Sequence, residues 1–361
     1  MNDDEKLKEV RARIDALDEQ IQTLITERAV CAQAVAHVKR ENGESSDFYR
    51  PEREAEVLRK VLKRNKGPLT DEEMARLFRE IMSACLAIEE PLQIAYLGPE
   101  GTFTQAAALK HFGHSVNTLS FAAIDEVFRE VEADAVHYGV VPVENSTEGV
   151  ISHTLDTFMR SSLKICGEVA LRIHHHLLGN VSGIKQITKI YSHQQTLAQC
   201  REWLDANLPG IERVAVSSNA EAARQAAAGK GTAAIASEAA AQIYGLESLY
   251  PNIEDEPDNM TRFLVIGRQE VQPSGADKTS ILVSAPNKPG ALHTLLQPFA
   301  RHNISMTRIE SRPSRQHTWD YVFFVDIEGH RQDKNVARAL EELEAEAPML
   351  KILGSYPKAV L

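Results

Sequence analysis

One run of apolar residues near the N-terminus constrains the fold more than any other feature of this 361-residue sequence. Apolar side chains recur there at intervals of three and four residues from Leu7 to Val38, which places them on one face of an α-helix. The pattern predicts a single helix about forty residues long. Arg28 stands where this apolar stripe should continue, so a permanent positive charge falls on the face that is expected to be buried.

Two shorter helical patterns follow within the first ninety residues. Pro51 suits the first turn of a helix that starts at about Arg50. Thr70 and Glu73 have the spacing of a capping box, and the helix that they begin should end before Pro91. These patterns predict an all-α segment at the N-terminus.

From Ile94 the sequence changes to short apolar runs, each followed by a loop of small residues and a helical pattern. This alternation is typical of α/β units. A polar, glycine-containing linker follows at 267–278. Residues 279–361 then have the order strand, helix, strand, strand, helix, strand, which predicts a ferredoxin-like α+β fold. We therefore expect three domains, at residues 1–91, 92–270 and 278–361.

The formal net charge of −11 argues against nucleic acid or an anionic membrane as the main partner. No run approaches the eighteen apolar residues of a membrane span, and the first residues lack an apolar signal region. The four cysteines form no CxxC pair. These features lead us to expect a cytoplasmic protein without a disulfide framework.

Basic residues on the long helix suggest an anion site. Arg28 and Lys39 are eleven positions apart, so they share a helix face about 16 Å apart and can clamp a small dianion. Arg11 lies about 25 Å from Arg28 and would serve a second site, most simply one shared with another copy of the chain. The alternative is that Arg28 is a structural charge paired with a glutamate of a neighbouring helix.

Together with residues of the next two helices, these positions resemble the all-helical chorismate mutase domain. The resemblance implies an intertwined homodimer in which Arg11, Arg28 and Lys39 hold the carboxylates and ether oxygen of chorismate, one arginine coming from the partner's long helix. The rearrangement to prephenate needs no nucleophile or proton transfer, so fixed cations suit it. The other residues that the resemblance assigns to catalysis or substrate binding are Arg50, Arg53, Glu54, Cys85 and Glu89.

Glu89 is expected to face the ether oxygen of chorismate. Only its protonated form could donate a hydrogen bond there, because an ionised carboxylate would repel the developing negative charge.

Four loops of the middle segment contain hydroxyl and amide side chains next to helix starts. They are GPEGTFT (98–104), ENSTEG (144–149), SHQQT (192–196) and NMTRF (259–263). Such groups can bind a carboxylate without a metal, although helix capping is the better explanation for Thr104, Ser146 or Thr147 taken singly. Three consecutive histidines at 174–176 alternate in direction and lack an acidic or cysteine cluster, so we predict no metal and no cofactor.

The four loops together resemble prephenate dehydratase from about Ile94 to Gly267. The resemblance implies two α/β lobes like those of periplasmic binding proteins, with the site between them. It assigns the essential threonine to Thr261, which would hydrogen-bond the leaving hydroxyl, while Glu144 and His193 remain alternative proton sources. The residues expected to bind the substrate are Thr102, Thr104, Glu144, Asn145, Ser146, His193, Gln194, Arg262 and Phe263.

The motifs PGALH (289–293) and IESRP (309–313) resemble the ACT regulatory domain that binds phenylalanine. Without that resemblance, Pro289 and Gly290 would be interpreted as a strand-to-helix turn and Arg312 as a surface charge. The residues expected to take part in regulation are Gly290, Ala291, Leu292, His293, Glu310, Ser311, Arg312 and Pro313.

The combined resemblance is to the bifunctional chorismate mutase/prephenate dehydratase family. It implies conversion of chorismate to prephenate and then to phenylpyruvate, with L-phenylalanine as allosteric inhibitor. The alternative is a non-catalytic amino-acid sensor or solute-binding protein, which the cationic stripe of the long helix disfavours.

Overall fold

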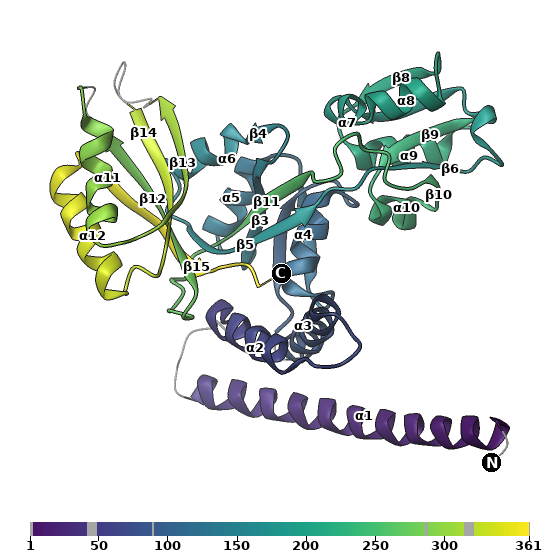
Figure 1. Cartoon of the computed structure of the whole chain (residues 1–361), viewed down its shortest axis with the longest axis horizontal. Coiled ribbons are helices and arrows are strands. Elements are labelled where there is room, and N and C mark those ends of the chain that lie inside the picture. The colour runs from purple at the N-terminus through teal and green to yellow at the C-terminus, as the bar shows by residue number, and fades with distance from the viewer. Residues whose placement is uncertain (1–2, 42–48, 89, 286–287, 314–320, 361) are drawn as a thin grey trace.

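The computed structural model describes residues 3–41, 49–88, 90–285, 288–313 and 321–360. Along the chain it consists of a helical segment, a two-lobed α/β segment and a C-terminal α+β segment (Figure 1). The fold class expected for each part of the sequence is confirmed.

The helical segment contains α1 (Asp3–Glu41), α2 (Pro51–Arg64) and α3 (Asp71–Ala87). Pro51 occupies the first turn of α2, and the Thr70 hydroxyl accepts the N–H of Glu73 at 3.2 Å, which is one half of the predicted capping box. α2 and α3 pack on each other, and α2 turns Leu58 and Val61 inward.

The apolar stripe of α1 is exposed in the single chain. α1 contacts α3, but its N-terminal half extends beyond α2 and α3 (Figure 1). Ten of its apolar residues are between 38 % and 63 % exposed: Leu7, Val10, Ile14, Leu17, Ile21, Leu24, Ile25, Val30, Val35 and Val38. A continuous apolar surface of this length is typical of a protein–protein interface.

The first lobe is a mixed sheet in the order β2-β1-β3-β11-β5, with the short β4 paired to β3. α4 packs on one face, and α5 and α6 pack on the other. The elements are β1 (Gln93–Leu97), α4 (Phe103–Phe112), β2 (Asn117–Phe121), α5 (Ile124–Glu132), β3 (Tyr138–Asn145), β4 (Gly149–Val150), α6 (Ser152–Phe158), β5 (Lys164–Arg172) and β11 (Met260–Gly267).

The second lobe has the strand order β10-β6-β9-β7-β8. The chain crosses between the lobes twice, from β5 to β6 and from β10 to β11 (Figure 1). The elements are β6 (His176–Gly179), η1 (Ile184–Gln186), β7 (Lys189–His193), α7 (Gln194–Gln199), α8 (Arg201–Asn207), β8 (Glu212–Val216), α9 (Asn219–Ala228), β9 (Thr232–Ala236), α10 (Glu238–Tyr244) and β10 (Glu247–Tyr250).

The C-terminal segment is an antiparallel sheet in the order β13-β14-β12-β15. Its helices cover one face, and the other face shares a hydrophobic core with the first lobe through Leu282, Phe324 and Leu353. The elements are β12 (Asp277–Ala285), α11 (Ala291–Arg301), β13 (Met306–Pro313), β14 (Tyr321–Glu328), α12 (Lys334–Glu346) and β15 (Leu350–Pro357). A side chain at Gly354 would run into the backbone of Ile165, so β15 and β5 lie in close contact.

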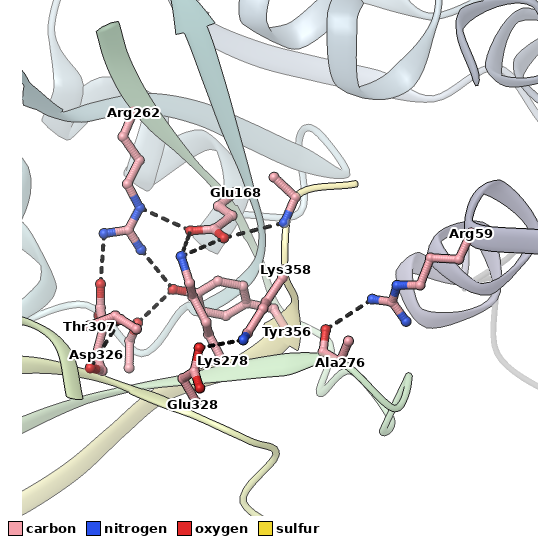
Figure 2. A network of polar contacts seen from close by, with 12 residues as sticks. Arg59, Glu168, Arg262, Ala276, Lys278, Thr307, Asp326, Glu328, Tyr356 and Lys358 are labelled. Carbon is pink, nitrogen blue, oxygen red and sulfur yellow. Dashed lines mark hydrogen bonds and ion pairs between the residues drawn. The ribbon is translucent and has the colours of Figure 1, made fainter. Parts of the chain in front are cut away.

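The predicted linker is held in place by the helical segment. Arg59 of α2 donates to the carbonyl oxygens of Ser274 at 2.8 Å and Ala276 at 2.9 Å (Figure 2). Asp277 accepts the backbone N–H of Ser274 at 2.9 Å. Hydrogen bonds to backbone carbonyls therefore attach the predicted linker to α2.

Candidate functional site

The three helices border an open hollow of about 700 Å³, called here the helical hollow, which residues outside the helices such as Phe112 and Gln272 also line. Arg28 enters it from α1, Arg53 and Glu54 from α2, and Cys85 from α3. Arg50 also lines it. Five of the residues that the sequence suggested are therefore gathered around one space.

Arg28 is a half-buried cation without a described counter-ion. The two neighbouring arginines are neutralised locally, since Arg53 bonds Glu56 at 3.0 Å and Arg50 bonds Glu52 at 2.8 Å. Among the described residues no acidic side chain forms an ion pair with Arg28. The alternative of a structural pairing with a neighbouring glutamate therefore has no support in this part of the chain, and Arg28 is available to an anionic ligand.

Burial and a nearby arginine have opposite effects on the pKa of Glu54. Its Oε1 lies 3.4 Å from Nε of Arg79 on α3. Burial raises the pKa of Glu54 to about 7, although Arg79 lowers it. Sequence analysis missed Arg79, but the signal was present, because Arg79 replaces an apolar residue in the series Ala75, Arg79, Met82 and Leu86, as Arg28 does on α1.

Three other residues that were predicted for the same site are not among those that the structure describes as lining the helical hollow. Arg11 lies on the exposed N-terminal half of α1 and is not among the lining residues. The side chain of Lys39 and the whole of Glu89 lie outside the described residues. Their roles stay predictions.

A second polar site lies where the lobes meet, and we call it the junction site. Asn145, at the end of β3, donates from Nδ2 to Thr261 Oγ1 at 2.7 Å and to Asn259 Oδ1 at 2.8 Å. Thr147 Oγ1 donates to Asn145 Oδ1 at 2.6 Å. Because the Thr261 oxygen accepts from Asn145, its hydroxyl proton is free to point toward a ligand.

The second lobe contributes Gln199 to the junction site. Its Nε2 donates to Thr147 Oγ1 at 3.3 Å and to Glu148 Oε1 at 3.2 Å, and its Oε1 lies 2.9 Å from Nε2 of His175. Burial lowers the pKa of His175. Sequence analysis did not select Gln199, His175 or Asn259. Asn259 could have been found, because it lies two residues before Thr261 and alternation along a strand places both side chains on one face.

Four other residues that were predicted to bind the substrate make contacts within the fold. The Thr102 hydroxyl donates to the Leu97 carbonyl at 3.1 Å, and Ser146 Oγ accepts the N–H of Met260 at 2.9 Å. Thr104 and Phe263 are buried, Phe263 in a hydrophobic cluster.

His193 and Gln194 mark the start of α7, where His193 is half-buried and Gln194 is exposed. The backbone N–H of His193 donates to Asn219 Oδ1 at 3.0 Å.

Glu144 and Arg262 are directed away from the Asn145–Thr261 pair. Glu144 Oε2 lies 2.9 Å from Nε of Arg308, and Arg262 Nη1 lies 2.7 Å from Oδ2 of Asp326. Arg308 and Asp326 both belong to the C-terminal sheet. The structure therefore places these two predicted substrate-binding residues at a contact with the third segment.

The candidate regulatory residues occupy two places in the C-terminal segment. Gly290 to His293 form the start of α11, where Gly290 has a φ of +81° and caps the helix. Glu310 to Pro313 lie on the edge strand β13. Arg312 donates to Ser152 Oγ at 2.7 Å and to Asp156 Oδ1 at 3.0 Å, so it also contacts the first lobe.

The three consecutive histidines at 174–176 bond to separate groups. Among the described residues, no set of three or more histidine, cysteine or acidic side chains is gathered in a metal-binding arrangement. None of the described helices combines the length and the apolar character that crossing a membrane requires.

Comparison with known proteins assigns all three segments to families. Residues 10–90 match the model of chorismate mutase type II, residues 94–271 that of prephenate dehydratase, and residues 279–345 that of the ACT domain. The bifunctional chorismate mutase/prephenate dehydratase of Stutzerimonas stutzeri is 62 % identical over 365 residues, and that of Pseudomonas aeruginosa is 61 % identical over 365 residues. Both matches cover 100 % of this chain and 100 % of the relative.

A solved structure extends the comparison to three dimensions. Prephenate dehydratase from Arthrobacter aurescens, in complex with L-Phe, is 35 % identical with a TM-score of 0.68. The match covers 74 % of this chain and 90 % of that chain.

Proposed function

The chain belongs to the bifunctional chorismate mutase/prephenate dehydratase family, and on that premise we propose which residues carry out its two reactions. The protein rearranges chorismate to prephenate and then dehydrates and decarboxylates prephenate to phenylpyruvate in phenylalanine biosynthesis, with feedback inhibition by L-phenylalanine. The alternative of a non-catalytic amino-acid sensor is not supported by these relatives. We assign the mutase to residues 1–91, the dehydratase to residues 92–270 and the ACT domain to residues 278–361.

The mutase reaction is assigned to the helical hollow. Arg28, the cation without a described acidic partner, binds a carboxylate of chorismate, and Lys39 stabilises the negative charge that develops on the ether oxygen. Arg53 and Glu54 lie at the same hollow, and Cys85 and Arg50 complete its wall. Holding a compact conformer between fixed charges is sufficient for a rearrangement that transfers no proton.

We assign Arg11 to the mutase site of a second copy of the chain. Arg11 and Arg28 are about 25 Å apart along α1, too far for one small ligand to contact both. The exposed apolar stripe of α1 supports pairing with another α1, because that contact would remove the apolar side chains on this face, from Leu7 to Leu24, from water. The proposed homodimer therefore contains two mutase sites, each completed by the partner.

The dehydratase reaction is assigned to the junction site. Prephenate loses its ring hydroxyl and a carboxylate together, so the leaving hydroxyl needs a hydrogen-bond donor. The Thr261 hydroxyl can donate, since its oxygen already accepts from Asn145 at 2.7 Å. Of the two proton sources considered, His193 is the better candidate, because Glu144 is ion-paired with Arg308.

Phenylalanine is assigned to the ACT domain, at the start of α11 and along β13. Gly290 leaves its surroundings open, since among the described residues, its two chain neighbours aside, no heavy atom lies within 4 Å of a Cβ placed there. The helix start behind it favours the amino acid's carboxylate. The substrates are charged and do not cross a membrane unaided, so the proposal keeps a cytoplasmic location.

The observation that carries the assignment is the match to bifunctional relatives over the full length of the chain. The experiment supplies purified protein with chorismate and follows prephenate and then phenylpyruvate. We expect both products in sequence, with phenylpyruvate formation inhibited by phenylalanine. Binding of phenylalanine without turnover of chorismate or prephenate would favour the sensor instead.

A further inference from the structure

The hydrogen bonds of the junction site have a defined direction, which is set at one end by the backbone. Asn145 Oδ1 accepts the backbone N–H groups of Thr147 and Glu148, both at 3.0 Å. Only the amide oxygen of Asn145 can take this place, so its amide nitrogen must point to Thr261 Oγ1, 2.7 Å away. Main-chain atoms therefore fix the orientation of the Asn145 amide.

Thr147 continues the same direction toward the second lobe. Its Oγ1 lies 2.6 Å from Asn145 Oδ1 and 3.3 Å from Asn259 Oδ1, so its one proton is used there. The Thr147 oxygen is left to accept from Gln199 Nε2 at 3.3 Å. Gln199 Nε2 also donates to Glu148 Oε1 at 3.2 Å, and a carboxylate can only accept. Gln199 must therefore turn its amide nitrogen to the first lobe and its oxygen to the opposite side.

His175 lies at the other end of this series of hydrogen bonds. Gln199 Oε1 is 2.9 Å from His175 Nε2, and because this oxygen only accepts, Nε2 must carry a proton. Burial lowers the pKa of His175, so the ring is neutral at neutral pH and Nδ1 carries no proton. Among the described residues Nδ1 has no hydrogen-bond partner. Only the tautomer with a proton on Nε2 thus satisfies the series that ends at Thr261.

The ring of His175 is held in place from both lobes. The residue lies on the segment that crosses from β5 to β6, where its N–H donates to Glu254 Oε2 and its carbonyl accepts the N–H of Ile253, both at 2.8 Å. Phe103, at the start of α4 in the first lobe, contacts the ring edge-to-face with centroids 5.7 Å apart. His175 is 1 % exposed, so it orients Gln199 from within the protein instead of contacting a ligand.

We propose that His175 is a positioning residue for the dehydratase reaction, in which its Nε2–H group fixes the Gln199 amide and so the direction of the hydrogen bonds that orient Thr261. The inference rests on the proposed dehydratase function of the junction site. Without the Nε2–H group the Gln199 amide is free to turn, and Thr147 loses its donor. The Thr261 hydroxyl is then less well aligned, and small displacements of this kind reduce catalytic rates strongly.

The test compares His175→Leu with the unchanged full-length protein. Leucine fills a similar volume without a donor, so we expect the dehydratase kcat to fall at least about tenfold, with KM for prephenate changing much less. His175→Gln restores an amide N–H near the place of Nε2 and should keep kcat within about threefold of the unchanged protein. Mutase activity and the thermal midpoint of the same preparations report whether each variant is folded. An equal loss of kcat in folded His175→Leu and His175→Gln would overturn the role of the Nε2–H group.

His175→Asn provides a second variant in case His175→Leu does not fold. The shorter asparagine places its amide near the position of Nδ1, where it does not reach Gln199 Oε1. It should therefore lose kcat although it is as polar as His175→Gln. A folded His175→Asn protein with the kcat of His175→Gln would contradict the proposal.

The matched control is His176→Leu. His176 Nδ1 accepts the backbone N–H of Asn252 at 3.2 Å, outside the junction site. Its loss should leave the dehydratase kcat within about twofold of the unchanged protein. A loss of kcat equal to that of His175→Leu would indicate general weakening of the segment between the lobes and would overturn the proposal.

A double variant tests whether His175 acts through Gln199. In a Gln199→Leu protein, His175→Leu should lower kcat no further, because the interaction can be lost only once. A double variant much slower than Gln199→Leu would show that His175 acts by another route. If the unchanged protein forms no phenylpyruvate, the proposed function fails. If it does and folded His175→Leu and His175→Asn are equally fast, only the positioning role fails.

Discussion

Arg11 and Arg28 lie on the same helix, but only Arg28 reaches the helical hollow. The two residues are separated by about 25 Å along the axis. Between and beyond them the apolar stripe of α1 is exposed. A mutase site that needs both arginines therefore requires two chains.

The first prediction tests this sharing with mixed chains. Arg11→Ala and Arg28→Ala should each inactivate the mutase, but refolding them together should restore about a quarter of the original activity. Random pairing makes half of the dimers hybrid, and each hybrid contains one intact site. Each variant refolded alone is the control. Hybrids that are demonstrated by mass but show no mutase activity would contradict a shared site.

The second prediction concerns the hydroxyl of Thr261. Thr261→Ala should lower phenylpyruvate formation by roughly 10²- to 10⁴-fold, because the leaving hydroxyl loses its hydrogen-bond donor, while chorismate rearrangement continues. Thr279→Ala is a suitable control, since that buried hydroxyl donates to the Gly329 carbonyl at 2.8 Å in another part of the chain. Loss of both activities in a folded Thr261→Ala protein would show that the two sites are not independent.

Local patterns were enough to predict the helices and strands, because periodicity depends on residues close in sequence. Of the junction site, Asn145 and Thr261 were assigned through the resemblance to prephenate dehydratase, whereas Gln199, His175 and Asn259 were not selected. Asn259 could have been predicted from alternation, since it lies two residues before Thr261, directly before the start of β11.

The ion-pair partners of Glu144 and Arg262 come from a contact between distant parts of the chain. Arg262 meets Asp326, 64 positions later, and Glu144 meets Arg308. Alternation along the two strands already places Glu144 and Arg262 on the face opposite to Asn145 and Thr261. What that face contacts depends on the packing of the C-terminal sheet on the first lobe, which no local pattern predicts.

The third prediction concerns phenylalanine binding at Gly290. This residue has a φ of +81°, which a side chain disfavours by roughly 1–2 kcal/mol, although there is space for a Cβ. Gly290→Ala should therefore disturb the start of α11 and raise the phenylalanine concentration needed for half-inhibition of the dehydratase. Gly210→Ala is the matched control, with a φ of +79° and open space around the Cβ in the second lobe.

A point substitution is a better test of regulation than deletion of the C-terminal segment. Leu282, Phe324 and Tyr356 belong to the core shared with the first lobe, so deletion after Arg268 would expose apolar surface and remove Asp326, the ion-pair partner of Arg262. Equal inhibition of Gly290→Ala and the unchanged protein would place the phenylalanine site elsewhere.

The last prediction uses the carboxyl group of Glu54, whose pKa is raised by burial from 4.5 to about 7. A raised pKa means that the folded protein binds this proton more tightly than the unfolded chain does. The stabilisation of the folded state by the protonated Glu54 carboxyl is therefore fully present below about pH 4.5. It declines as the pH rises toward 7 and is absent above it, a change of about 3 kcal/mol in the free energy of unfolding.

Glu54→Gln should remove this pH dependence from the urea-unfolding free energy of the helical segment, because an amide does not titrate. Glu56→Gln, which alters a half-exposed partner of Arg53 and Lys60 on the same helix, should keep it. Identical stability profiles for Glu54→Gln and the unchanged protein between pH 4.5 and 8 would contradict a raised pKa of Glu54.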